Sequence, residues 1–246
     1  MDKLIYTAMT GARQIMDQQS TVANNLANVG NNGFREQVDS FRSVPVPGKG
    51  LETRVQVLTE SASSNFKQGS IRQTGRNLDV AIEGQGWLAV TAADGREAYT
   101  RAGDLKLSAN GMLQTQGGET VLGENGPLTI PDDTPVLIGK DGTVSALVPG
   151  VVPATMDIIG RLKLVNPPAS SLVRGEDGLF RAAPGQVVEA DPSVTVQGGA
   201  LEDSNVNAVD AMVKMIALGR QFDMQMDLLK NAENNASKAS QIMNLT

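Results

Sequence analysis

Helical periodicity at the two ends of the chain constrains the fold more than any other feature of the sequence. Apolar or small residues recur at spacings of three and four from Leu4 to Leu26, which predicts a helix over residues 3–27. The same spacing returns after Asn207 and continues for about 36 residues. Asn207 is a suitable N-cap, and Asp210 places a carboxylate in the first turn, where the helix dipole favours negative charge. The chain is therefore expected to begin and end with a long amphipathic helix.

Short β patterns separated by turn dipeptides occupy the middle of the chain. Asn-Gly or Asp-Gly pairs recur at residues 94–95, 110–111, 125–126, 141–142 and 177–178. These dipeptides suit two-residue hairpin turns, because both of their residues tolerate positive φ. The regular spacing predicts a mainly antiparallel β domain over residues 76–190.

The segment between the first helix and the β domain has a different character. Proline and glycine interrupt any periodicity between residues 45 and 50, and only residues 53–59 alternate like a strand. We interpret residues 31–75, together with 191–202, as an extended connector. The remaining residues, 1–30 and 203–246, form the expected terminal helical domain.

The expected fold class is α+β. A mainly antiparallel β central domain is inserted between long N- and C-terminal α-helices, and these helices are expected to pair as a coiled coil. This layout is unusual for an enzyme and is typical of a subunit that polymerises through its ends.

Composition argues against several classes of function. The chain has no His and no Cys, so it lacks the usual residues of thiol catalysis, His general bases and structural zinc. Its net charge is −6 and its basic residues form no stripe, which argues against a nucleic-acid-binding function. No stretch approaches the roughly 18 apolar residues of a membrane span or resembles a secretory signal. We expect no cofactor, no metal, no nucleic-acid partner and no membrane insertion. The protein is expected either in the cytosol or outside it after export without a cleaved signal.

Five asparagines crowd the end of the first predicted helix, and they have two interpretations. Asn31 and Asn32 are expected to form the turn that follows the helix, since asparagine and glycine tolerate the left-handed conformation. An amide both donates and accepts, so amides at a seam between stacked subunits can pair without the repulsion of identical charges. We predict such contacts for Asn24, Asn25 and Asn28; the alternative is that Asn28 caps the helix and the other two face solvent.

The apolar stripe of the C-terminal helix also has two explanations. It can pack on the N-terminal helix of the same chain, or it can contact a neighbouring subunit, and we expect both. The residues predicted at subunit contacts, with Leu26 on the first helix, are Met215, Leu218, Phe222, Met226 and Leu229. Val209, Val213 and Ile216 are expected to extend the early part of the same face.

Four segments resemble signature sequences of the flagellar rod and hook protein family. They are NNLANVGNNGF (24–34), GSIRQTGRNLDVAIEGQGWLAV (69–90), YTRAGDL (99–105) and LEDSNVNAVDAMVKMI (201–216). The resemblance covers essentially the whole chain in the family's order. Residues 1–19 and the short passage 42–51 favour a proximal rod protein, with a distal rod protein as the alternative.

The resemblance implies a structural subunit of the bacterial flagellar basal-body rod, the axial drive shaft of flagellum-dependent motility. Its implied partners are other rod proteins, copies of itself in a helical assembly, and the flagellar export apparatus during secretion. The implied location is the rod that crosses the periplasm, reached by type III export without a cleaved signal peptide.

A peptidoglycan-binding or -cleaving β module is the alternative from another class of function. Asp79 and Glu83, with Glu97 or Asp104, could form the carboxylate pair of a glycan-cleaving site, but nothing in the sequence fixes their separation. One Trp and two Tyr are few for stacking on sugars. The glycine-rich residues 83–87 lack the Lys-Ser/Thr of a phosphate loop and are expected to form a turn. We predict no catalytic residue.

Overall fold

The computed structural model divides the chain into two compact units. It describes residues 2–45, 55–131, 134–147, 156–183, 186 and 188–243. The first unit, here called the terminal unit, comprises Met1–Val29, Glu36–Asn65 and Val206–Thr246. The second, the β unit, comprises Gly30–Arg35 and Phe66–Asn205. The domain limits drawn from the sequence remain predictions about which parts fold independently.

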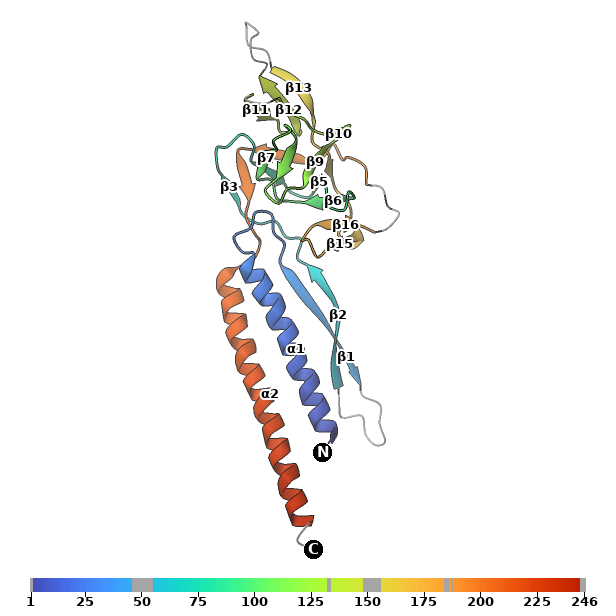
Figure 1. Ribbon diagram of the computed structural model, residues 1–246, viewed down its shortest axis with the longest axis vertical. Coiled ribbons are helices and arrows are strands. Elements are labelled where there is room, and N and C mark those ends of the chain that lie inside the picture. The colour runs from blue at the N-terminus through green and yellow to red at the C-terminus, as the bar shows by residue number, and fades with distance from the viewer. Residues whose placement is uncertain are drawn as a thin grey trace. The chain divides into compact units, whose positions relative to one another are not determined.

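The terminal unit consists of two helices and a β-hairpin. Helix α1 (Asp2–Ala27) and helix α2 (Ala208–Met243) lie side by side and run in opposite directions (Figure 1). Strands β1 (Gln37–Pro45) and β2 (Val55–Ser64) pair antiparallel and contact α1. The hairpin thus gives α1 a second partner besides α2.

Helix α2 begins where its sequence predicts. The side-chain Oδ1 of Asn207 accepts the backbone N–H of Val209 at 3.0 Å and that of Asp210 at 3.3 Å. These bonds satisfy two N–H groups that have no partner inside the helix. The N-cap therefore fixes the first turn of α2.

The predicted fold class is wrong in its account of the terminal helices, which are not a two-helix coiled coil. A coiled coil buries one narrow apolar seam per helix against the partner helix. Here α1 also packs on the hairpin, and α2 leaves Val209, Met212, Val213 and Ile216 at least half exposed. The prediction failed because it assigned the apolar residues of each helix to a single partner, and because it placed the hairpin in an extended connector.

The β unit is built from short strands that follow one another along the chain. Their bounds are β3 (Ile71–Gln73), β4 (Val80–Glu83), β5 (Trp87–Thr91), β6 (Glu97–Thr100), β7 (Leu105–Leu107), β8 (Leu113–Thr115), β9 (Thr120–Gly123), β10 (Gly126–Pro127), β11 (Val136–Ile138), β12 (Thr143–Leu147), β13 (Met156–Arg161), β14 (Leu164–Val165), β15 (Leu172–Arg174), β16 (Phe180–Ala182), β17 (Thr195–Gly198) and β18 (Ala200–Glu202). A short 3-10 turn, Ala169–Ser171, precedes β15.

Antiparallel pairing organises these strands into several sheets. Within the described residues, the order of the central sheet is β15-β16-β6-β5-β9-β8-β7, with β10 beside β9 and β14 beside β5. Strands β11, β12 and β13 form a further sheet, and the pairs β17–β4 and β18–β3 complete the unit. Val90, Leu105, Leu113, Val121 and Val144 are among the fully buried residues of the core.

A second cluster in the β unit gathers most of its few aromatic side chains. Trp87 packs against Phe66 and Phe180 with ring centroids 5.8 and 4.7 Å apart, and Tyr99 lies in the same cluster. Edge-on and tilted ring contacts of this kind add stability beyond the area they bury. Burial raises the pKa of Tyr99 to about 12, with smaller contributions from the Glu97 carboxylate.

A buried ion-pair cluster holds the segments by which the chain enters and leaves the β unit. The Glu202 carboxylate lies 2.6 Å from Arg35 Nη1 and 2.8 Å from Arg101 Nη1, and all three side chains are almost completely buried. Glu202 Oε1 also accepts the Gly69 N–H at 2.8 Å, and the Glu202 backbone carbonyl accepts the Gly33 N–H at 2.7 Å. Glu202 thus joins three segments that lie next to the crossings between the two units.

Two guanidinium groups share this one carboxylate, and the Trp87 ring lies beside both. The Cζ atoms of Arg35 and Arg101 are 5.9 and 5.5 Å from the ring centroid. An aromatic face attracts a desolvated cation, which offsets part of the excess positive charge. Burial lowers the pKa of Arg101, and the Glu202 carboxylate counters part of that shift.

Candidate assembly surface

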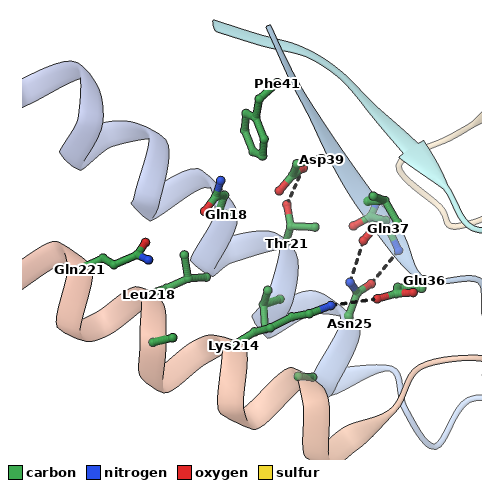
Figure 2. A pocket seen from close by; sticks show the side chains of 14 residues that line it. Gln18, Thr21, Asn25, Glu36, Gln37, Asp39, Phe41, Lys214, Leu218 and Gln221 are labelled. Atoms are coloured by element: carbon green, nitrogen blue, oxygen red, sulfur yellow. Dashed lines mark hydrogen bonds and ion pairs between the residues drawn. The ribbon is translucent and has the colours of Figure 1, made fainter. Parts of the chain in front are cut away.

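The side-chain amide of Asn25, one of the five asparagines near the end of α1, forms its hydrogen bonds within the chain. Its Nδ2 donates to the backbone carbonyl of Gln37 at 2.8 Å, and its Oδ1 accepts the Gln37 N–H at 2.8 Å (Figure 2). The amide therefore pairs with the start of β1 as a neighbouring strand would. Asn25 is 4% exposed, so these two bonds replace the water that both atoms lose.

Replacing Asn25 with alanine is expected to detach the start of the hairpin from α1. The change leaves two backbone groups of Gln37 without their partners, which costs about 1–3 kcal/mol for each group that stays buried. We expect faster amide hydrogen exchange at Gln37 than in the unaltered chain. Asn24→Ala is the matched control and should leave that rate unchanged, because Asn24 is exposed. Equal exchange at Gln37 in both variants would contradict the role of Asn25.

The other predicted residues of α1 lie on different sides of the helix. Asn24 is exposed, while Leu26 and Asn28 are half-buried. Asn28 Nδ2 donates to the Asn24 backbone carbonyl at 2.8 Å and lies 3.4 Å from its side-chain oxygen. This bond caps a carbonyl of the last turn, so Asn28 serves the end of the helix.

A groove of about 510 Å³ lies in the terminal unit between α1, β1 and α2 (Figure 2). Beside the Asn25 pair, Thr21 Oγ1 donates to Asp39 Oδ1 at 3.0 Å. Lys214 Nζ lies 3.8 Å from Glu36 Oε1. These links tie the hairpin to both helices, although the exposed Lys214 pair contributes little on its own. The groove could not be predicted from local sequence patterns, because it depends on the hairpin.

The predicted contact residues of α2 lie mostly on the side that packs within the chain. Leu218 is buried, Met215, Phe222 and Leu229 are half-buried, and Met226 is 46% exposed. A helix turns by about 100° per residue, so the buried positions cluster on one face. Of this set, Met226 presents the largest exposed area to the surroundings of the chain.

The sequence interpretation missed an apolar stripe on the opposite face of α2, here called the outer stripe. Val209, Met212, Val213 and Ile216 follow spacings of three and four and are 68, 50, 61 and 60% exposed. Val209, Val213 and Ile216 were expected to extend the face of Leu218. The angles of the helix separate them, since Val213 and Leu218 lie about 140° apart around the axis. The signal for the stripe is therefore the angle of each residue around the helix axis, which the spacing along the chain alone does not show.

The carboxylates considered for glycan cleavage each have a structural partner in the β unit. Asp79 accepts from Thr74 at 2.7 Å and lies 3.1 Å from Arg76. The remaining pairs are Glu83 with Thr195 and Lys140, Glu97 with Lys163, and Asp104 with Asn32. In the described part of the chain, no group of three acidic side chains is placed to hold a metal ion. No helix among those residues is long and apolar enough to cross a membrane.

Comparison with known proteins assigns both units to one class. Residues 81–146 match the model of the flagellar hook protein FlgE/F/G D1 domain, and residues 197–242 match that of the flagellar basal body rod FlgEFG protein C-terminal region. The chain is therefore one of the flagellar rod and hook proteins. The family resemblance of the four sequence segments is confirmed.

Full-length relatives narrow the assignment. The flagellar basal-body rod protein FlgF of Escherichia coli K12 is 44% identical over 100% of both chains, and so is FlgF of Salmonella typhimurium LT2. FlgG of Buchnera aphidicola from Acyrthosiphon pisum is 29% identical over 97% of this chain and 98% of its own. This chain belongs to the FlgF family of flagellar basal-body rod proteins.

Proposed function

We propose that the terminal unit polymerises with copies of itself and with other rod proteins, and so builds the proximal part of the flagellar rod. The single observation that carries this proposal is the exposed apolar surface of both terminal helices. Besides the outer stripe of α2, the side chains of Tyr6, Met9 and Met16 on α1 are 66, 54 and 57% exposed. Contiguous exposed apolar surface of this kind marks an interaction site.

The residues predicted at subunit contacts divide into two roles within this proposal. Asn24 and Met226 are exposed and would touch a neighbouring subunit directly. The remaining residues would act by fixing how α1, α2 and the hairpin pack, which sets the shape offered to a neighbour. These residues are Asn25, Leu26, Asn28, Met215, Leu218, Phe222 and Leu229.

The proposal extends to how the chain reaches its site. The chain would pass through the flagellar export apparatus without a cleaved signal peptide and fold in the part of the rod that crosses the periplasm. Its lack of Cys suits that route, because a chain without thiols forms no unwanted disulfide in an oxidising compartment.

Complementation tests the function directly. In the encoding bacterium without its own copy of the gene, the full chain is expected to restore swimming and to co-purify with basal bodies. Mass spectrometry of purified basal bodies provides the measurement. Restored motility with no trace of the chain in basal bodies would contradict a structural role.

The same assay tests the proposal that the chain has no catalytic role. Glu83→Gln should swim as the unaltered chain does, because Glu83 is half-buried beside Thr195 and its loss removes only surface contacts. A zymogram on peptidoglycan should show no clearing by the purified chain. Clearing that Glu83→Gln abolishes would instead support the glycan-cleaving alternative.

A further inference from the structure

We infer that the outer stripe of α2 binds the exposed face of α1 from a second copy of this chain, in an antiparallel helix pair. This inference rests on the proposed function and adds to it the partner, the face and the register. The arrangement repeats between copies what α1 and α2 already do within one chain, but it uses the opposite face of α2.

The exposed face of α1 is shaped to accept the outer stripe. Ser20, Ala23 and Ala27 follow the spacing of three and four and are all exposed. Their small side chains leave room along one side of the helix. The outer stripe presents larger side chains that are mostly β-branched, so small positions on one helix can receive large ones from the other.

The register within one chain gives a reference for the register between copies. A Cβ on Gly11 would lie 3.6 Å from the Gln225 side chain, so these two positions lie opposite each other in the antiparallel pair. Two copies placed side by side at the same height would align their helices in this same register. Ser20 then faces Ile216, and Ala23 faces Val213.

Charges on the two faces match in this register. Arg13 falls opposite Asp223, and Asp17 falls within one residue of the position opposite Arg220, so two pairs of opposite charge form together. All four side chains are exposed, and among the described residues none of them takes part in an ion pair. Complementary charges of this kind fix the register of an interface more than they strengthen it.

Neighbouring registers bring like charges together. Sliding the helices by about one turn in one direction places Arg13 opposite Arg220. Sliding them by a turn in the other direction places Asp17 opposite Asp223. Like charges at an interface are costly, so the charge pattern selects the register in which both apolar and charged positions match.

The geometry of the pairing also determines the kind of assembly. Each copy uses α1 toward one neighbour and α2 toward the other, so the interface is heterologous. In a heterologous contact, each added copy still has one unpaired helix face that can bind a further copy. The assembly therefore either closes into a ring or continues as an open helical filament. A closed two-fold dimer would use the same patch on both copies, which this pairing does not.

A charge exchange tests the register in whole cells. Arg13→Asp and Asp223→Arg are each expected to lower the amount of the chain in basal bodies by at least about tenfold, because each places like charges opposite each other. The double variant should restore both the amount and swimming. No rescue by the double variant would overturn the register, and unchanged assembly of both single variants would overturn the interface.

Cysteine pairs give a second readout that does not depend on the charges. Because the chain has no Cys, any disulfide between copies of it must join introduced residues. Ala23→Cys with Val213→Cys should give chain dimers and larger species when intact basal bodies are oxidised. The control pair, Ala23→Cys with Leu228→Cys, should not, since Leu228 lies fifteen residues or about 22 Å further along α2.

The outcomes separate this inference from the proposed function. Basal bodies that contain the chain but yield no Ala23–Val213 cross-link would overturn the inference and leave the function intact. A cross-linked species that joins the chain to a different rod protein would overturn the choice of partner. Absence of the unaltered chain from basal bodies would overturn the function itself.

Discussion

Glu202→Gln is expected to lower the free energy of unfolding of the β unit by about 3–5 kcal/mol, the usual cost of removing one partner from a buried ion pair. The change leaves Arg35 and Arg101 facing each other without a carboxylate, in a site where all three side chains are almost completely buried. Without the carboxylate, the two guanidinium groups repel each other in a site that excludes water. Denaturant unfolding followed by the fluorescence of Trp87, the single Trp of the chain, measures the loss.

Glu97→Gln is the matched control for this experiment. Glu97 pairs with Lys163 at 2.7 Å in the same unit, but the two side chains are 33 and 18% exposed. Water compensates for a lost pair of this kind, and we expect a change below about 1 kcal/mol. Equal losses in the two variants would show that burial of the Glu202 cluster does not set its contribution.

Gly33→Ala is expected to destabilise the β unit by at least about 2 kcal/mol. Gly33 has a φ of +68°, and a left-handed conformation costs a residue with a Cβ about 1–3 kcal/mol. The added Cβ would also overlap the backbone carbonyl group of Arg101, and a backbone group shifts at a higher cost than the end of a side chain. The same Trp87 fluorescence experiment reports the change.

Gly30→Ala provides the comparison in the same segment. A Cβ at Gly30 would meet no atom within 4 Å, so the substitution should leave the unfolding midpoint nearly unchanged. A similar loss in both variants would contradict the role of the positive φ and of the close approach to Arg101, because the lower entropy of the unfolded chain with alanine favours folding at both positions.

Local signals predicted the elements of this fold. The spacing of apolar residues and the Asn207 cap located α1 and α2 closely. The Asn-Gly and Asp-Gly dipeptides located turns of the β unit, and the five glycines concerned all have positive φ, at Gly95, Gly111, Gly126, Gly142 and Gly178. These features depend on neighbours in the sequence, so the sequence alone is enough to reveal them.

Features that depend on distant residues were not predictable in the same way. The hairpin of β1 and β2 is held to α1 by hydrogen bonds from Asn25 and Thr21. Neither residue type indicates from the sequence that its side chain will bind a strand. Asn25 illustrates the difficulty, because its position suggested a contact between subunits and carried no sign that its amide also pairs with Gln37 inside the chain. The burial of Arg35 and Glu202 was not predictable either, since a charged side chain is rarely buried and no local sequence pattern marks such a position.

The Glu202 cluster has a mechanical consequence for a protein whose family builds a rotating shaft. The backbone passes between the two units four times, after Val29, Arg35, Asn65 and Asn205. Glu202 binds Gly33, Arg35 and Gly69 near three of these crossings, and it lies close to the fourth itself. A force or torque that is transmitted along one crossing is therefore distributed over the other crossings, because the Glu202 cluster holds their ends together.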